Sequence, residues 1–529
     1  MKIKELFRNK KFRYGGASVV FTALVITLII VINAAVTGLA SGYHWYVDTT
    51  EKQLYTLSDT SVMLLDEVFL PQNGEAPVFA GKMSIIFLTE KDKILSGDST
   101  EAEYLKQVHE LALTYAARYP EHIELRYVDM YTSPGALADY KSKGVSLTPT
   151  TVIFDNNKGV FRVTGLQSFF AYDRSSQTEP IGFYGEHRIT SSVLSLCARS
   201  SVAYVTEGHG EDELSEGFTL LLESCGYTLK KVNLLEMDNF TAAAMEDSPR
   251  LVIVNNPKYE FVGVGQGGRS EVMMLSDLMS GKFTDPSNPT FASLLLFADP
   301  DKGCANDNIN SLLTGWGLTV CSTAADKIKE VQSASLDASR ISFFPEYSRD
   351  ALTLALTQKL SSAENFKTVV NGAGSVKIED VWESTNTSGD INNAAVLRAS
   401  SGAVTDGGSA AGAAILALAQ KENIVSGTIK KYNYVTVCAD ADFISDEYLN
   451  TASYANEAML VSIARMTVSD KDPTPRAVNI AFKDYVAETN VEGVSNAGKQ
   501  TFVIMMAGVL PLLILTAGLI VYVRRRNRV

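Results

Sequence analysis

The chain has 529 residues, about three times the length of a typical domain, so we expect more than one folded unit. Hydrophobic residues make up 46% and charged residues 20%, with 37 glycines and 15 prolines, which excludes a disordered or fibrous chain. The net charge is −13. An acidic surface repels phosphates, so we expect no nucleic-acid partner.

Two long uncharged apolar runs lie near the ends of the chain. Residues 17–36 supply 20 mostly apolar residues, about 30 Å of helix, which matches the hydrocarbon thickness of a bilayer. Residues 501–523 form a second run, interrupted by Pro511, which neighbouring helices or a local kink can accommodate. The sequence therefore predicts transmembrane helices over 17–40 and 501–523, in contact with membrane lipid.

Short basic tails flank these runs at 1–16 and 524–529, and the positive-inside rule places both in the cytoplasm. The tails contribute +5 and +4 to the total of −13, so the region between them carries about −22 and should lie outside the cytoplasm. The alternative for the first run is a cleavable signal peptide ending near Ala40. Either way, the central region is exported.

Five cysteines are too few and too widely spaced for a metal or disulfide framework. Their number is odd, and none forms a Cys-x-x-Cys pair. We expect at least one free thiol, buried as a small hydrophobic side chain. The cysteines are Cys197, Cys225, Cys304, Cys321 and Cys438.

The first exported segment, 41–75, reads as a stalk that ends in a helix capped by Ser58, with Asp59 in the first turn. The pattern over 76–182 is strand, helix, strand, helix, proline and hairpin, which resembles a thioredoxin-like fold with Pro149 in the place of its cis proline. No cysteine precedes Cys197, so this domain lacks redox chemistry. The elements expected are strands at 83–89, 123–128, 148–154 and 160–163, helices at 103–119 and 136–143, and a turn at 155–159.

A connecting helix at 183–198 leads to a second domain, 199–466, in which strands and helices alternate as in a doubly wound sheet. Residues 326–408 read as short strands and loops, 400–412 as a surface connection, and 467–500 as a second stalk. The fold class expected is α/β: a thioredoxin-like domain plus a doubly wound domain, flanked by two transmembrane helices. The second domain's strands are expected at 202–206, 228–234, 251–254, 291–298 and 434–439, and its helices at 215–224, 270–280, 306–314 and 456–466.

Acidic loops follow three of these strands, at the sheet edge where open α/β sheets bind ligands. One hypothesis is a cation-binding or general-base site centred on His209. The alternative is that these residues only form tight turns, with Gly208 and Gly210 at positive φ and His209 in a surface turn. The spacing matches no metal motif, so we expect the alternative, with no metal, cofactor or catalytic residue. The candidate ligand-binding residues are Glu207, His209, Glu211, Asp299, Asp440 and Asp442.

Short segments occur in one order across nearly the whole chain: Asp48-Thr49-Thr50 with 54–58, then 185–190, 206–211, 296–300, 312–318, 396–401 and 439–444. Together with the two apolar runs, they resemble the ABC-type transport-system auxiliary family that includes the gliding-motility protein GldG. The resemblance implies a non-catalytic subunit anchored at both ends, working with a separate ABC permease and ATP-binding subunit. It carries over no catalytic residue.

Two other functions remain open at this stage. One is an exported hydrolase or metal-dependent enzyme that uses His209 and nearby carboxylates, and the other is a stand-alone surface receptor. Members of the auxiliary family often join such domains to permease segments, but this chain has only two apolar runs. Any permease must therefore be another polypeptide.

Overall fold

The computed structural model describes residues 26–27, 31 and 53–485, except 72–75, 98, 143–145, 174–175, 198–200, 235–239, 264–269, 301–306, 322–323, 362–366, 380–390, 426–428, 452, 469–479 and 481–482. Apart from 26–27 and 31, the predicted transmembrane helix at 17–40 lies outside these residues, as do the one at 501–523 and both basic tails. Within the described residues, no helix combines the length and apolar character needed to cross a bilayer.

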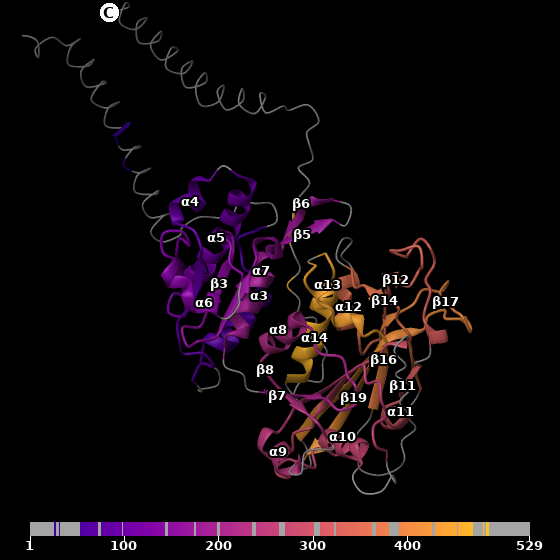
Figure 1. Cartoon of the computed structure of the whole chain (residues 1–529). Coiled ribbons are helices and arrows are strands. Elements are labelled where there is room, and N and C mark those ends of the chain that lie inside the picture. The colour runs from indigo at the N-terminus through magenta and orange to yellow at the C-terminus, as the bar shows by residue number, and fades with distance from the viewer. Residues whose placement is uncertain are drawn as a thin grey trace, which may run out of the picture.

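The first unit, drawn in indigo to purple in Figure 1, is built on a four-stranded sheet in the order β2-β1-β3-β4. The central strand β1 (Met83–Phe87) runs parallel to β2 (Ile123–Tyr127) and antiparallel to β3 (Val152–Asp155), which forms a hairpin with β4 (Phe161–Thr164). All four predicted strands are confirmed. The helices beside them are α4 (Lys91–Ser96), α5 (Thr100–Arg118), η1 (Pro134–Leu137) and α6 (Ala138–Ser142).

Helix α3 (Asp59–Phe69) begins as predicted, because the Ser58 hydroxyl accepts a hydrogen bond from the Ser61 amide at 3.2 Å. Its apolar side chains Leu64, Leu65 and Phe69 are buried in the same core as the strands of the first unit. The end of the segment predicted as a stalk is therefore packed onto the folded unit.

The prediction of a cis bond before Pro149 is wrong, because no peptide bond in the described residues is cis. The Thr151 amide donates to the Thr148 carbonyl at 3.0 Å, which makes Pro149 the second residue of a four-residue turn. Proline at that position favours the common turns with a trans bond, whereas a cis turn needs it one residue later.

A small three-stranded sheet joins two distant parts of the chain. It contains β5 (Phe170–Asp173), β6 (Ser176–Phe183) and β21 (Lys483–Asp484) in the order β21-β6-β5. After the hairpin of β5 and β6, α7 (Gly185–Ser195) forms the predicted connecting helix. Strand β21 returns from the second unit to the first, so both ends of 53–485 meet in the first unit.

The second unit is built on a ten-stranded mixed sheet. Five strands that the sequence predicted lie side by side and parallel, namely β8 (Tyr227–Val232), β7 (Ser201–Thr206), β9 (Leu251–Asn255), β10 (Ser293–Phe297) and β20 (Ile429–Cys438). The other five are antiparallel to their neighbours: β19 (Ala414–Val425), β16 (Ile391–Arg398), β15 (Ser375–Ile378), β13 (Glu346–Tyr347) and β11 (Leu318–Cys321).

The sequence did not predict β19. Its first residues are rich in alanine, which is depleted in strands, so the local preference for a strand is weak. The strand is held instead by pairing with β20 along Leu416 to Val425 and with β16 along Ala414 to Lys421. Tertiary pairing therefore outweighs the local signal.

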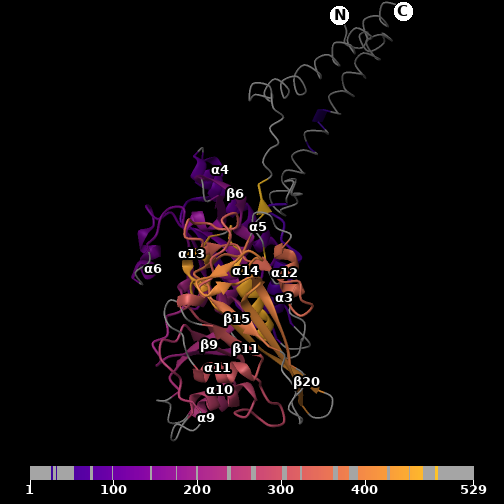
Figure 2. The same cartoon turned by 90° about the vertical axis from the view of Figure 1, so that its right-hand side faces the viewer.

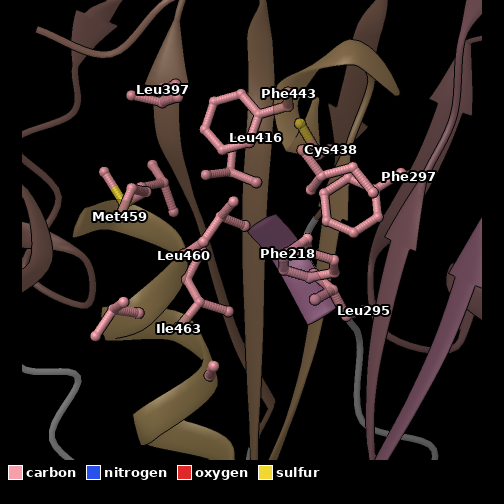
Figure 3. Close-up of a cluster of buried hydrophobic side chains, with 14 of the residues drawn as sticks. Phe218, Leu295, Phe297, Leu397, Leu416, Cys438, Phe443, Met459, Leu460 and Ile463 are labelled. Atoms are coloured by element: carbon pink, nitrogen blue, oxygen red, sulfur yellow. The ribbon is translucent and has the colours of Figure 1, made fainter. Parts of the chain in front are cut away.

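Helices cover both faces of the large sheet. On one face, α8 (Glu216–Ser224) and α14 (Asn456–Val468) pack against alternate strand residues, and Figure 3 shows Phe218, Leu295 and Leu460 meeting there. On the other face lie α9 (Phe240–Asp247), α10 (Glu271–Met279) and α11 (Asp307–Thr314). Strand β9 contributes Leu251 to the first core and Val252 to the second, as the two-residue period of a strand requires.

The remaining described elements are short. They include a two-stranded ribbon within 400–412, where a surface connection was predicted. The short elements are η2 (Leu166–Phe169), η4 (Ala324–Asp326), β12 (Ser342–Phe343), α12 (Leu354–Ser361), β14 (Val370–Asn371), β17 (Val404–Thr405), β18 (Gly408–Ser409), η5 (Asp442–Ile444) and α13 (Asp446–Leu449).

The fold is mixed α/β, with several sheets. Its first unit lies at the opposite end of the molecule from α9 and α10 (Figure 2).

Four buried polar side chains join the two units, and we call them the interunit node: Tyr184, His187, Arg188 and Glu457. His187 Nε2 lies 2.8 Å from Glu457 Oε1, and the Tyr184 hydroxyl donates to Glu457 Oε2 at 3.1 Å. Arg188 Nη1 lies 3.5 Å from Glu457 Oε1, and its Nη2 donates to the Leu449 carbonyl at 3.2 Å. Burial alone would raise the pKa of Glu457, but Arg188 and His187 outweigh it and lower the pKa to about 2. The carboxylate is therefore ionised and bound from the first unit.

Candidate functional site

The carboxyl ends of β7, β9, β10 and β20 form one edge of the large sheet, because these neighbouring strands are parallel. The predicted ligand-binding residues follow β7, β10 and β20 along this edge. The structure divides them into two groups, one around His209 and one around Asp440. Glu207 belongs to neither, because its side chain is exposed.

The loop after β7 turns sharply on both sides of His209. Gly208 has φ of 116° and Gly210 has φ of 68°, so the predicted positive-φ glycines are confirmed. The expected surface position of His209 is wrong, because the side chain is only 4% exposed. The two glycine turns direct the imidazole inward, beneath the loop that follows β9.

His209 lies between two carboxylates and an aromatic ring. Its Nε2 is 2.9 Å from Glu271 Oε2, and its Nδ1 is 3.3 Å from Glu211 Oε1. The imidazole stacks on Phe261 with ring centroids 3.9 Å apart and planes 13° apart. Sequence reasoning missed Glu271, which lies 62 residues away at the start of α10. Only its place in the first turn of a helix hinted at a polar role.

Charge balance keeps this imidazole protonated. Burial alone would lower the pKa of His209, but the hydrogen bonds and charges of Glu211 and Glu271 outweigh it and raise the pKa to about 9. The carboxylates are anchored too, since Glu211 Oε2 accepts from the His209 amide at 2.6 Å and Glu271 Oε2 from the Val262 amide at 2.8 Å. An imidazolium with both nitrogens bonded to carboxylates has no free lone pair for a metal or for taking a proton.

The second group surrounds Asp440, directly after β20. Asp440 Oδ2 accepts from the Asn371 amide at 2.8 Å, and Oδ1 accepts from the Asp442 amide at 2.9 Å. Asp442 Oδ2 accepts from Asn371 Nδ2 at 3.0 Å. Asn371 lies in β14, a region predicted only as short strands and loops. It is the polar partner that sequence reasoning missed here.

Asp440 is 2% exposed. Burial is the main cause that raises the pKa of Asp440 to about 8, and the negative charges of Asp442 and Asp299 raise it further. The hydrogen bonds that the carboxyl accepts lower this pKa, but they do not outweigh burial. The group therefore keeps its proton at neutral pH. A cation would have to displace that proton to bind this carboxyl.

Asn256 connects the loops after β7 and β10 across the edge. It has φ of 51°, which asparagine tolerates better than most residues. Its Oδ1 accepts from the Asp299 amide at 3.1 Å, and its Nδ2 donates to Asp212 Oδ2 at 2.6 Å. The loops after β7, β9 and β10 are thus fixed to one another by internal hydrogen bonds.

In the described part of the chain, no group of three or more His, Cys, Asp or Glu side chains has the arrangement of a metal site. Cys197, Cys225 and Cys438 are buried thiols outside any disulfide, as predicted. Burial raises the pKa of Cys225 to about 11, so this thiol is not a nucleophile at neutral pH.

No model of a known protein family matches the chain, and no curated protein matches it either.

Replacing His209 with alanine should destabilise the protein by about 3–5 kcal/mol, because Glu271 would remain as a buried carboxylate without its cationic partner. The folded-state pKa of His209, about 9, lies above its ordinary value of 6.5. Its contribution is therefore complete below pH 6.5 and is lost as the pH rises through about 9. Urea unfolding of the wild-type and His209→Ala proteins at several pH values measures the difference. Glu207→Ala is the matched control and should stay within about 0.5 kcal/mol of wild type.

Chelation should leave the melting temperature unchanged, because both His209 nitrogens are engaged by carboxylates and both Asp440 oxygens accept from backbone amides. Calorimetry with and without a chelator measures this. A chelator-induced drop that disappears in His209→Ala would show a metal bound at His209, since a bound ion stabilises the native state by mass action.

Proposed function

We propose that this chain is a membrane-anchored, non-catalytic auxiliary subunit of an ABC transport system with a large extracytoplasmic region. The observation that carries the proposal is that the two described segments nearest the predicted membrane spans meet. Lys483 Nζ donates to the Gln53 carbonyl at 2.8 Å and to the Thr56 carbonyl at 2.5 Å, and it lies 2.9 Å from Glu186 Oε2. Both predicted spans would then approach the bilayer from one point of the exported region.

The same Glu186 also holds the start of α3. Its Oε1 accepts from the Ser58 amide and from the Ser61 hydroxyl, both at 2.6 Å. Burial alone would raise the pKa of Glu186, but Lys483 and the Ser58 and Ser61 hydrogen bonds lower it. We call Ser58, Ser61, Glu186 and Lys483 the membrane-proximal clamp. A clamp of both chain ends suits a protein anchored twice in one membrane.

The sheets support the two domain types in the proposal. In the first unit, the order β2-β1-β3-β4 with β3 antiparallel to β1 is that of a thioredoxin-like fold, although the trans Pro149 departs from its pattern. In the second unit, five parallel strands with helices on both faces support a doubly wound arrangement, extended by antiparallel strands. Neither domain type implies an activity by itself.

The state of the acidic loops favours a non-catalytic role over the enzyme alternative. A hydrolase or metal-dependent enzyme would need His209 as a free base or ligand, but both of its nitrogens are engaged with carboxylates. A stand-alone receptor would have the same membrane topology but no permease or ATP-binding subunit as partners. Isolating the chain together with its partners therefore distinguishes the auxiliary subunit from the receptor.

Topology is tested by labelling introduced cysteines with a membrane-impermeant maleimide on intact cells. Ala136→Cys, at an exposed position of the first unit, should react, whereas Ile3→Cys and Asn527→Cys should react only after permeabilisation. The unsubstituted chain is the control for its native cysteines. Reaction at 527 together with protection at 136 would reverse the proposed orientation.

Partnership is tested by affinity purification of the full-length chain from detergent-solubilised membranes of its native host. A multi-span permease and an ATP-binding subunit should be recovered in near-equal amounts with the chain. An unrelated tagged two-span protein from the same membranes is the control. Recovery of the chain without both subunits would contradict the transport role and favour the receptor.

A further inference from the structure

Neighbouring residues in the first turn of α7 bind opposite parts of the molecule. Glu186 belongs to the membrane-proximal clamp, whereas His187 and Arg188 belong to the interunit node. All three side chains are buried. One helical turn therefore contacts both membrane-proximal segments and the second unit.

The C-terminal side of the clamp is a short segment, 483–485, which we call the β21 strap. Strand β21 pairs with β6 over only two residues, and the Tyr485 amide donates to the Ile181 carbonyl at 3.0 Å. Ile480 is 6% exposed and packs in the core of the first unit. Short edge elements of this kind open at much lower cost than the core strands of a domain.

The strap supplies a charge that the first unit needs. Glu186 Oε2 is buried and makes no hydrogen bond within the described residues, so the Lys483 ammonium at 2.9 Å balances it. If β21 detached, this oxygen would become a buried charge without a cation, an arrangement that proteins avoid. The Glu186 side chain would then have to move toward water.

A shift of Glu186 would reach the node through covalent and packed contacts. The backbone of this turn is fixed by the Arg188 amide donating to the Tyr184 carbonyl at 3.2 Å and by the Tyr115 hydroxyl donating to the Glu186 carbonyl at 2.9 Å. The rings of Tyr184 and His187 stack with centroids 4.5 Å apart. Displacing this turn would move His187 and Arg188 relative to Glu457.

We infer that the first turn of α7 couples the docking of the β21 strap to the attachment of the second unit, so that release of Lys483 from Glu186 loosens Glu457 from His187 and Arg188. The strap has two states, docked or detached, and the node responds to them. This coupling goes beyond the proposed transport role and stands whether or not the chain has an ABC partner.

Hydrogen exchange of the full-length chain, measured in detergent micelles, tests the coupling at two amides. The Tyr485 amide reports docking of β21, and the Met459 amide, which donates to Ala455 at 3.0 Å in α14, reports the node side. In Lys483→Ala, both should exchange roughly fivefold faster or more, the usual lower range of coupling between sites. Lys483→Arg should restore most of the protection at both amides.

Two controls separate coupling from general destabilisation. Lys430→Ala removes an exposed lysine that lies 2.8 Å from Glu422 in the β19–β20 hairpin, and it should change neither amide. The Ala298 amide, which donates to Cys438 at 2.9 Å in the large sheet, should keep its wild-type exchange rate in Lys483→Ala. Faster exchange at Tyr485 with unchanged exchange at Met459 would overturn the inference.

The reverse experiment covers the case in which Lys483→Ala does not fold. Because coupling between two sites is reciprocal, Glu457→Gln should also speed exchange at the Tyr485 amide, although position 457 does not lie in the clamp. Wild-type exchange at Tyr485 in a folded Glu457→Gln protein would likewise overturn the inference.

Discussion

Glu457 enters the interunit node from α14 with its carboxylate buried against His187 and Arg188 of α7. A buried carboxylate is tolerated only when cations and hydrogen-bond donors replace the water that it loses. The donors here come from the other unit, so the charge is satisfied only when the two units are joined. This requirement favours the observed position of the units, alongside other contacts between them such as that of Ser453 with the Tyr172 carbonyl.

The same requirement is met in two ways at the edge of the large sheet. Glu271, which is fully buried, is paired with an imidazolium, and the pair holds the loop after β7 against α10. Asp440 instead accepts from the Asn371 and Asp442 amides and keeps its proton. Four of the side chains that suggest chemistry in the sequence are thus hydrogen-bonded within the protein: His209, Glu211, Asp440 and Asp442.

The membrane-proximal clamp extends this principle to the ends of the folded region. Lys483 binds two carbonyls of the N-terminal segment as well as Glu186, so a single ammonium holds three distant parts of the chain. Since α7 carries both Glu186 and the node residues, the path from the segments at 53–56 and 483–485 to the second unit is short.

The sequence by itself determined the elements whose signals are local: the Ser58 cap of α3, the helix α5, the β3–β4 hairpin and the five parallel strands. It also determined the glycine turns around His209, because positive φ is a property of single residues. Tertiary structure alone decided the strand β19, the burial of His209, and the partners Glu271, Asn371 and Lys483. These depend on contacts between residues far apart in the chain, where pairing and charge burial decide the outcome and local sequence carries only a weak signal.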